Sequence, residues 1–170
     1  MLGFLFRGLT ADPHRGAALF DAVTAKTREP DWYVEGTVPD TLDGRFAVLP
    51  TITALVLARI EREGENGNPT SVALTERFIE VMESEHRELG LGDPTLGKTV
   101  RKLVGSLGRR TELWRAAVGG ERDWNEATRE SLYKESVSAD ALRHSAEALR
   151  NLWTKLQDVS AEALSDGRIE

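Results

Sequence analysis

The chain contains no cysteine, so it can form neither a disulfide bond nor a thiolate metal site, and it has no cysteine nucleophile. Histidine is scarce as well. The three histidines, His14, His86 and His144, lie far apart and lack the H-x-x-x-H and H-E-x-x-H spacings of zinc sites. The G-x-S-x-G elbow that presents a serine nucleophile is also missing. These absences predict a protein without enzymatic activity, metal or cofactor.

Basic residues are outnumbered, because 22 lysines and arginines stand against 28 aspartates and glutamates. The resulting net charge of -6 argues against a general nucleic-acid binder, although a local basic patch can persist in an acidic protein. Two acidic pairs are better explained as helix caps and solvated faces than as a general acid and base: Asp40 with Asp43, and Glu83 with Glu85.

The uncharged run in the first half of the chain is too short to span a membrane as a helix. The run between Arg45 and Arg59 would span about 20 Å as a helix, whereas a bilayer core is about 30 Å thick. Its apolar residues point to nearly every side, which is typical of a helix buried by its neighbours. We therefore predict a core helix within Val38 to Glu61. Pro50 should bend it or split it near Ala47.

The rest of the chain predicts further helices and no strand, because no alternation of period two is long enough. With 40% hydrophobic residues, a chain of 170 residues can bury one sizeable core. The expected fold is all-α, a single compact domain of about six helices around a buried, Pro-bent central helix. Predicted helix starts are Asp12 with Pro13, Thr70 or Ser71, Asp93 with Pro94, Trp124, and Ser138.

Three segments follow from this pattern: a flexible N-terminal segment at 1–12, the helical domain at 13–160 and a frayed tail at 161–170. The N-terminal segment is apolar but too short for a signal peptide. It is either a frayed or packing segment or a shallow membrane-surface foot, whose side chains would be Leu2, Phe4, Leu5 and Phe6.

The clearest amphipathic helix is the one expected from Asp93 to about Val118. Gly105 and Gly108 weaken it by roughly 1 kcal/mol each relative to alanine, which indicates either close approach by another backbone or a softened helix. Its basic residues either bind an anionic partner or form an ordinary solvated face. The candidates for partner binding are Lys98, Arg101, Lys102, Arg109 and Arg115.

The beginning of that helix matches the P-loop pattern G-x-x-x-x-G-K-[ST] from Gly92 to Thr99. A phosphate loop needs a buried strand before its first glycine, but the preceding residues have helical periodicity. Pro94 also removes one amide from the cradle. We therefore interpret the match as accidental, with Gly92 to Pro94 serving as a helix-helix turn.

Aromatic and histidine side chains receive structural interpretations as well. Trp32 and Tyr33 are expected to be packed plugs, the alternative being a ligand platform. His86 follows Met82 by four residues and should lie at the edge of the core, not bind a ligand.

Two motifs resemble those of the ubiquinol-cytochrome c chaperone family. The first is PDTLDGRF, preceded by Trp32 and Tyr33, and the second is GLGDPTLGK, which leads into the basic helix. The resemblance covers roughly Asp21 to Trp153, with Pro50 and Thr51 departing from the aromatic or aliphatic residues usual there. The motif residues are Asp40, Thr41, Asp43, Gly44, Arg45, Phe46, Gly92, Asp93, Gly97 and Lys98. Within the first motif, the acids could cap the central helix, Arg45 could pair with an acid and Gly44 could permit close packing, the alternative being direct client contact.

The resemblance implies a non-enzymatic assembly chaperone that binds newly made cytochrome b and promotes assembly of the cytochrome bc complex. Mitochondrial members act with a small partner protein and associate with the ribosome near its exit tunnel. The short form implies a bacterial protein in the cytoplasm, beside the inner membrane, without a transmembrane span. The basic residues would then attract ribosomal RNA or anionic lipid headgroups, without sequence-specific nucleic-acid binding. The alternative function is a helical adaptor for a soluble partner.

Overall fold

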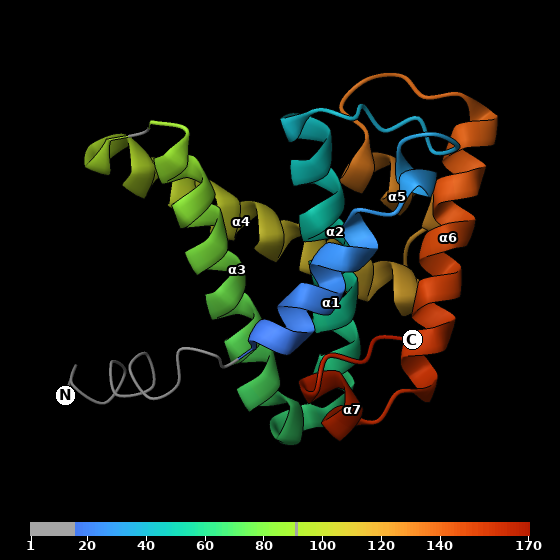
Figure 1. The fold of residues 1–170 in the computed structure, drawn as a ribbon. Coiled ribbons are helices and arrows are strands. Elements are labelled where there is room, and N and C mark those ends of the chain that lie inside the picture. Colours follow the sequence, from blue (N-terminus) through green and yellow to red (C-terminus); the bar gives the residue numbers. More distant parts are fainter. Residues whose placement is uncertain (1–15, 91) are drawn as a thin grey trace.

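The computed structural model describes residues 16–90 and 92–170, except for the side chain of Asp93. These residues form helices and no strand, so the all-α prediction is confirmed (Figure 1). The α-helices are α1 (Ala17–Thr27), α2 (Leu42–Ile60), α3 (Asn68–Glu88), α4 (Asp93–Val118), α5 (Trp124–Leu132), α6 (Ala139–Asp158) and α7 (Ala161–Ser165). Two 3-10 helices, η2 (Pro30–Trp32) and η3 (Glu61–Gly67), connect them.

Helix α2 is the centre of the fold, as predicted. It packs against α1, α3, α4, α5 and α6, and from Ala47 to Ile60 its residues are buried on all sides. Val48, Ile52 and Leu55 have no exposed surface. Burying each such side chain contributes roughly 1.5 to 3 kcal/mol, so this helix supplies the core that holds the others. Among the helices of the described ranges, none is long and apolar enough to cross a membrane.

Pro50 does not split α2, which runs without interruption from Leu42 to Ile60. The predicted break near Ala47 is therefore wrong. Two threonines after the proline bond back to the preceding turn: the Thr51 hydroxyl donates to the Ala47 carbonyl at 2.7 Å, and the Thr53 hydroxyl donates to the Leu49 carbonyl at 2.8 Å. Packing on every side adds to these bonds, so the neighbouring helices hold the chain helical through the proline.

The start of α2 is built by the first sequence motif. The Thr41 side chain caps the helix by accepting a hydrogen bond from the Gly44 amide at 3.2 Å, so the expectation that the aspartates cap it is wrong. Asp40 instead accepts two hydrogen bonds from Arg45, at 2.8 and 3.0 Å, which confirms the predicted ion pair. Gly44 lies against Pro39, whose carbonyl oxygen would be 1.8 Å from an added β-carbon. Close packing through glycine is thus confirmed.

Two other boundaries differ from the predictions. Helix α3 begins at Asn68, not at a cap from Thr70 or Ser71, because the preceding 3-10 turn leads into it directly. Gly90, with φ 86°, ends it as expected. Helix α4 begins as predicted, and Ser138 caps α6 by accepting from the Ala141 amide at 3.2 Å.

Several expectations fall outside the described residues. They are the helix start at Asp12 and Pro13, the histidine at 14, and the apolar side chains Leu2, Phe4, Leu5 and Phe6.

The end of α3 and the beginning of α4 project away from the other helices as an arm, here defined as residues 83–90 and 92–106 (Figure 1). The second half of α4 returns to the core, where Leu107, Trp114 and Ala117 are buried. A β-carbon at Gly105 would meet only the Arg109 side chain, at 3.5 Å, and one at Gly108 would meet no described atom within 4 Å. No other backbone approaches these glycines, so the close-approach prediction is wrong, since the helix faces solvent there.

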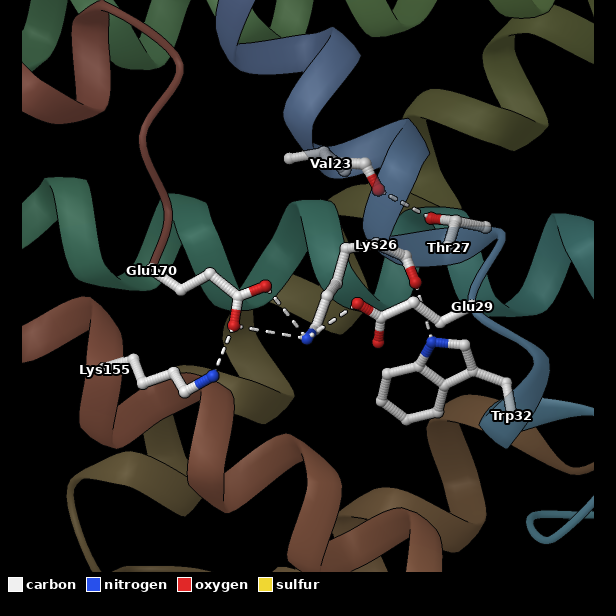
Figure 2. Close-up of polar contacts among 7 residues, drawn as sticks. All are labelled: Val23, Lys26, Thr27, Glu29, Trp32, Lys155 and Glu170. Atoms are coloured by element: carbon white, nitrogen blue, oxygen red, sulfur yellow. Dashed lines mark hydrogen bonds and ion pairs between the residues drawn. The ribbon is translucent and has the colours of Figure 1, made fainter.

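The C-terminal residues are not frayed, which corrects the predicted tail at 161–170. They form α7, and Gly167 then packs against the carbonyl of Ala18. Ile169 is buried at 5% exposure. Figure 2 shows the Glu170 carboxylate accepting hydrogen bonds from Lys26 of α1, at 3.2 Å, and from Lys155 of α6. An apolar anchor and a paired carboxylate therefore hold the tail across two helices.

We expect Gly44→Ala to lower the free energy of unfolding by about 2 to 4 kcal/mol, because its methyl group overlaps the Pro39 carbonyl. Gly108→Ala is the matched control, since its methyl group enters open space on α4. It should raise the free energy of unfolding by up to about 1 kcal/mol. Urea denaturation measures both values, and equal effects at the two positions would contradict the close packing at Gly44.

Hydrogen bonding from Lys155 lowers the pKa of Glu170 below its ordinary value of 4.5, against partial burial and with help from Lys26. A lowered carboxyl pKa stabilises the fold above that ordinary value, and this contribution is lost as the pH falls through the lowered pKa. Glu170→Gln should therefore cost less than about 1 kcal/mol at pH 7, since the pair is partly exposed. Denaturation should show this difference vanishing as the pH falls through the lowered pKa, and a constant difference across the acidic range would contradict the ion pairing.

Candidate partner-binding surfaces

A groove opens where α1, the start of α2 and the end of α3 meet, with a cavity volume of about 540 Å³. We refer to it as the α1–α3 groove. Apolar side chains make up much of its lining: Phe20, Val34, Leu42, Phe46, Leu49, Val81 and Met82. The sequence did not predict this groove, because its walls come from three helices whose packing against one another no local pattern describes.

Two aliphatic side chains at the groove are open to solvent. Val34 is 68% exposed and precedes the first sequence motif, and Leu42, which belongs to that motif, is 44% exposed. Phe46, from the motif itself, is half-buried and stacks on His86 with ring centroids 5.2 Å apart. Adjacent exposed apolar side chains in a concave surface are typical of a site that binds apolar partners.

The polar groups of the groove are mostly held in place. The Tyr33 hydroxyl donates to the Thr27 carbonyl at 2.8 Å. Burial raises the pKa of Tyr33, while Arg45 lowers it and Asp40 raises it, so the phenol is neutral at physiological pH. The Thr24 hydroxyl is buried without a hydrogen-bond partner among the described atoms.

Trp32 and Tyr33 have different environments, although both were expected to be plugs. Trp32 is 1% exposed and donates from its indole nitrogen to the Lys26 carbonyl at 2.8 Å, which confirms the prediction for this residue (Figure 2). Tyr33 is half-buried and lines the α1–α3 groove. It therefore combines packing with access to the groove.

A second surface runs along α4, from the arm to Arg109. Lys98, Arg101, Lys102 and Arg109 are exposed and line one hollow along α4, and we call these four residues the basic α4 face. None of the four forms an ion pair with another described residue, in contrast to Arg87 on α3, which pairs with Glu83 at 2.8 Å. The structure thus brings four of the five predicted basic residues together. Their charges are available to an anionic partner.

Arg115 is the fifth predicted basic residue, and it is placed differently. Two nitrogens of its guanidinium each donate at 2.9 Å to the Glu61 carboxylate. Hydrogen bonding to Glu61 raises the pKa of Arg115 against slight desolvation. Its charge is therefore balanced within the protein.

A cluster of buried hydrogen bonds around Ser131, the Ser131 node, anchors α4 to the core, and no sequence pattern predicts it. The Ser131 hydroxyl of α5 lies 2.6 Å from the Thr51 hydroxyl and accepts from the Trp114 indole at 3.2 Å. Arg110 donates to the Ser131 carbonyl at 3.0 Å, and burial lowers the pKa of this guanidinium, with Arg109 adding to the effect. Thr51, which departs from the family pattern, therefore uses its hydroxyl inside the core.

Pro50 and Thr51 are both buried, so neither offers a surface for client contact.

The P-loop match from Gly92 to Thr99 forms the N-cap and the first turns of α4. Helix α3 precedes them, and the Leu96 amide donates to the Gly92 carbonyl at 2.8 Å in the first turn of α4. The helix-helix interpretation of the P-loop match is confirmed.

The remaining titratable candidates are dispersed. His86 is half-buried, with Nδ1 2.7 Å from the Met82 carbonyl oxygen, which confirms its place at the core edge. Asp43 pairs with Lys134 at 3.5 Å. In the ranges that the structure covers, no three histidine or acidic side chains gather as metal ligands would.

Comparisons with known proteins agree on one family. The family model described as Ubiquinol-cytochrome C chaperone matches residues 35–170. The crystal structure of the Cbp3 homolog from Brucella abortus is similar, with a TM-score of 0.77 and 26% sequence identity over 100% of this chain and 96% of that one. No curated protein sequence gives a significant match. The matched range includes both sequence motifs and the C-terminal tail.

We expect Ser131→Ala to lower the free energy of unfolding by about 1 to 3 kcal/mol, because it leaves the Trp114 indole and the Thr51 hydroxyl with fewer buried partners. Thr154→Ala is a matched control, since that hydroxyl bonds only its own helix at an exposed position. The control should stay within about 0.5 kcal/mol of the parent. Denaturant unfolding compares them, and similar values would contradict the importance of the node.

Proposed function

Because the chain belongs to the ubiquinol-cytochrome C chaperone family, we propose that it binds newly made cytochrome b and promotes assembly of the cytochrome bc complex. The observation that carries the proposal is the family match over residues 35–170. The resemblance seen in the two sequence motifs is thereby confirmed, and it supports a chaperone role. The protein would act without catalysis, by holding an apolar client until that client is assembled.

We place the client in the α1–α3 groove. Its apolar lining, together with exposed Val34 and Leu42, suits a hydrophobic segment better than a soluble polar surface. A cavity of about 540 Å³ takes a few side chains at a time, so the groove would hold one face of a client helix.

The first motif would shape this site in two ways. Thr41 and Gly44 fix the start of α2, which positions Leu42 and Phe46 at the groove. Arg45 has a side chain that is 60% exposed, and its pair with Asp40 lies at the groove edge. The motif therefore acts mainly through structure, with Arg45 available for direct contact.

The basic α4 face would meet an anionic partner, either the ribosome exit region or the inner-membrane surface. Its four cations have no ion-pair partner within the described chain. In this role the protein works in the cytoplasm of a bacterium, with its client leaving the ribosome nearby. A small partner protein is not required by any of these contacts.

We expect a Val34→Asp/Leu42→Asp variant to capture cytochrome b about tenfold or more less efficiently from cells that are translating it, because charges would enter the apolar groove. Both positions are exposed, so the fold should be retained. Affinity capture followed by mass spectrometry measures the effect.

The matched control is Val72→Asp, because Val72 is 47% exposed on α3 outside the groove lining. It should capture cytochrome b as the parent does. A parent protein that enriches a soluble protein and no cytochrome b would favour a helical adaptor, and undiminished capture by the double variant would move the client away from the groove.

A further inference from the structure

The basic α4 face is the strongest charged feature of the described surface, and the proposed function leaves its partner general. We propose that this face docks on a membrane surface rich in anionic phospholipid headgroups. The inference rests on the proposed function, because the membrane contact would hold the chaperone where its apolar client inserts. The experiment that tests the contact needs no client.

Charge is concentrated there to an unusual degree for an acidic protein. Between Pro94 and Thr111 lie five of the 22 basic residues of the chain and none of its 28 acidic residues. The four members of the face project from one side of α4 over about three helical turns, or about 16 Å. Anionic headgroups along a bilayer surface would neutralise several of these cations at once.

Arg110 strengthens the positive potential from below. Its guanidinium is largely buried beside the cation of Arg109. It donates hydrogen bonds to the Ser106 hydroxyl and the Ser131 carbonyl, and both of these acceptors are uncharged. No described carboxylate pairs with it. Arg110 therefore adds a positive charge next to Arg109 of the face that no described carboxylate neutralises by an ion pair.

The chemistry of the arm favours lipid over RNA. From Ile79 to Leu113 the sequence contains no phenylalanine, tyrosine or tryptophan, whereas proteins that bind unpaired bases commonly stack them on aromatic rings. The arm instead exposes aliphatic side chains, with Leu89 57% and Val104 40% exposed. Aliphatic groups exposed on the same arm as cations suit the boundary between headgroups and acyl chains.

The position of the arm allows this contact. Figure 1 shows it extending beyond the body of the protein, so a flat surface can reach it without meeting α6 or α7. The rest of the chain is acidic and would be repelled by an anionic membrane. Charge alone would therefore orient the protein with α4 toward the membrane and the other helices away from it.

Vesicle sedimentation tests the proposal with the full chain and no client. The parent should bind vesicles of one-third phosphatidylglycerol and two-thirds phosphatidylcholine, and should not bind pure phosphatidylcholine. A Lys98→Glu/Lys102→Glu/Arg109→Glu variant should partition about 100-fold more weakly onto the anionic vesicles. Circular dichroism and urea unfolding confirm that each variant is folded.

The matched control is Arg122→Glu/Arg129→Glu/Arg143→Glu, which makes the same charge change on exposed positions of other elements. It should bind anionic vesicles within about threefold of the parent. A Leu89→Ser/Val104→Ser variant separates lipid from other polyanions, because it should weaken vesicle binding several-fold while leaving the weak binding of a short RNA duplex unchanged.

Equal binding of the parent to both kinds of vesicle, or undiminished binding of the triple variant at the basic α4 face, would overturn the proposal. Preference for the RNA duplex over anionic vesicles would overturn it in favour of a ribosomal contact. Capture of cytochrome b is measured separately and depends on the groove, so failure of either proposal leaves the other result interpretable.

Discussion

The structure depends on one constraint, which is that the apolar surface of α2 must be covered on every side. Five helices pack around it, and each contributes its own apolar stripe to that contact. Helices used in this way have little apolar surface left for a partner. The apolar residues that remain exposed are therefore informative, and Val34 and Leu42 lie at the groove where α1, α2 and α3 do not close completely.

The same constraint explains the arm. Only the second half of α4 reaches α2, where the Ser131 node fastens it to α2 and α5. The first half extends past the core and is free to carry charge instead of apolar residues. The α1–α3 groove and the basic α4 face thus follow from one packing arrangement. The groove lies at the edge of the core, and the basic α4 face extends beyond it.

The sequence predicted those features that depend on local pattern. The apolar run of α2, the bounds of α4, the Ser138 cap and the clustering of Lys98 with Lys102 all follow from helical periodicity or from capping residues. The sequence did not predict the ion pair that neutralises the exposed Arg115, because its partner Glu61 lies on another element. Local pattern carries no information on such pairings.

The features that the sequence missed depend on contacts between distant residues. The tail looked frayed because its residues are polar, yet Glu170 meets Lys26 across the fold (Figure 2). The continuity of α2 through Pro50 results from packing that no local rule describes. The groove likewise exists only once three helices have assembled.

Site-specific crosslinking tests most directly whether the groove holds the client. A photoreactive amino acid is placed at Val34, within the groove lining, or at Val72, which is exposed on α3 outside it. In cells translating cytochrome b, the account predicts a crosslink to that protein from position 34 and none from position 72. Crosslinking from both positions alike, or from neither, would contradict it.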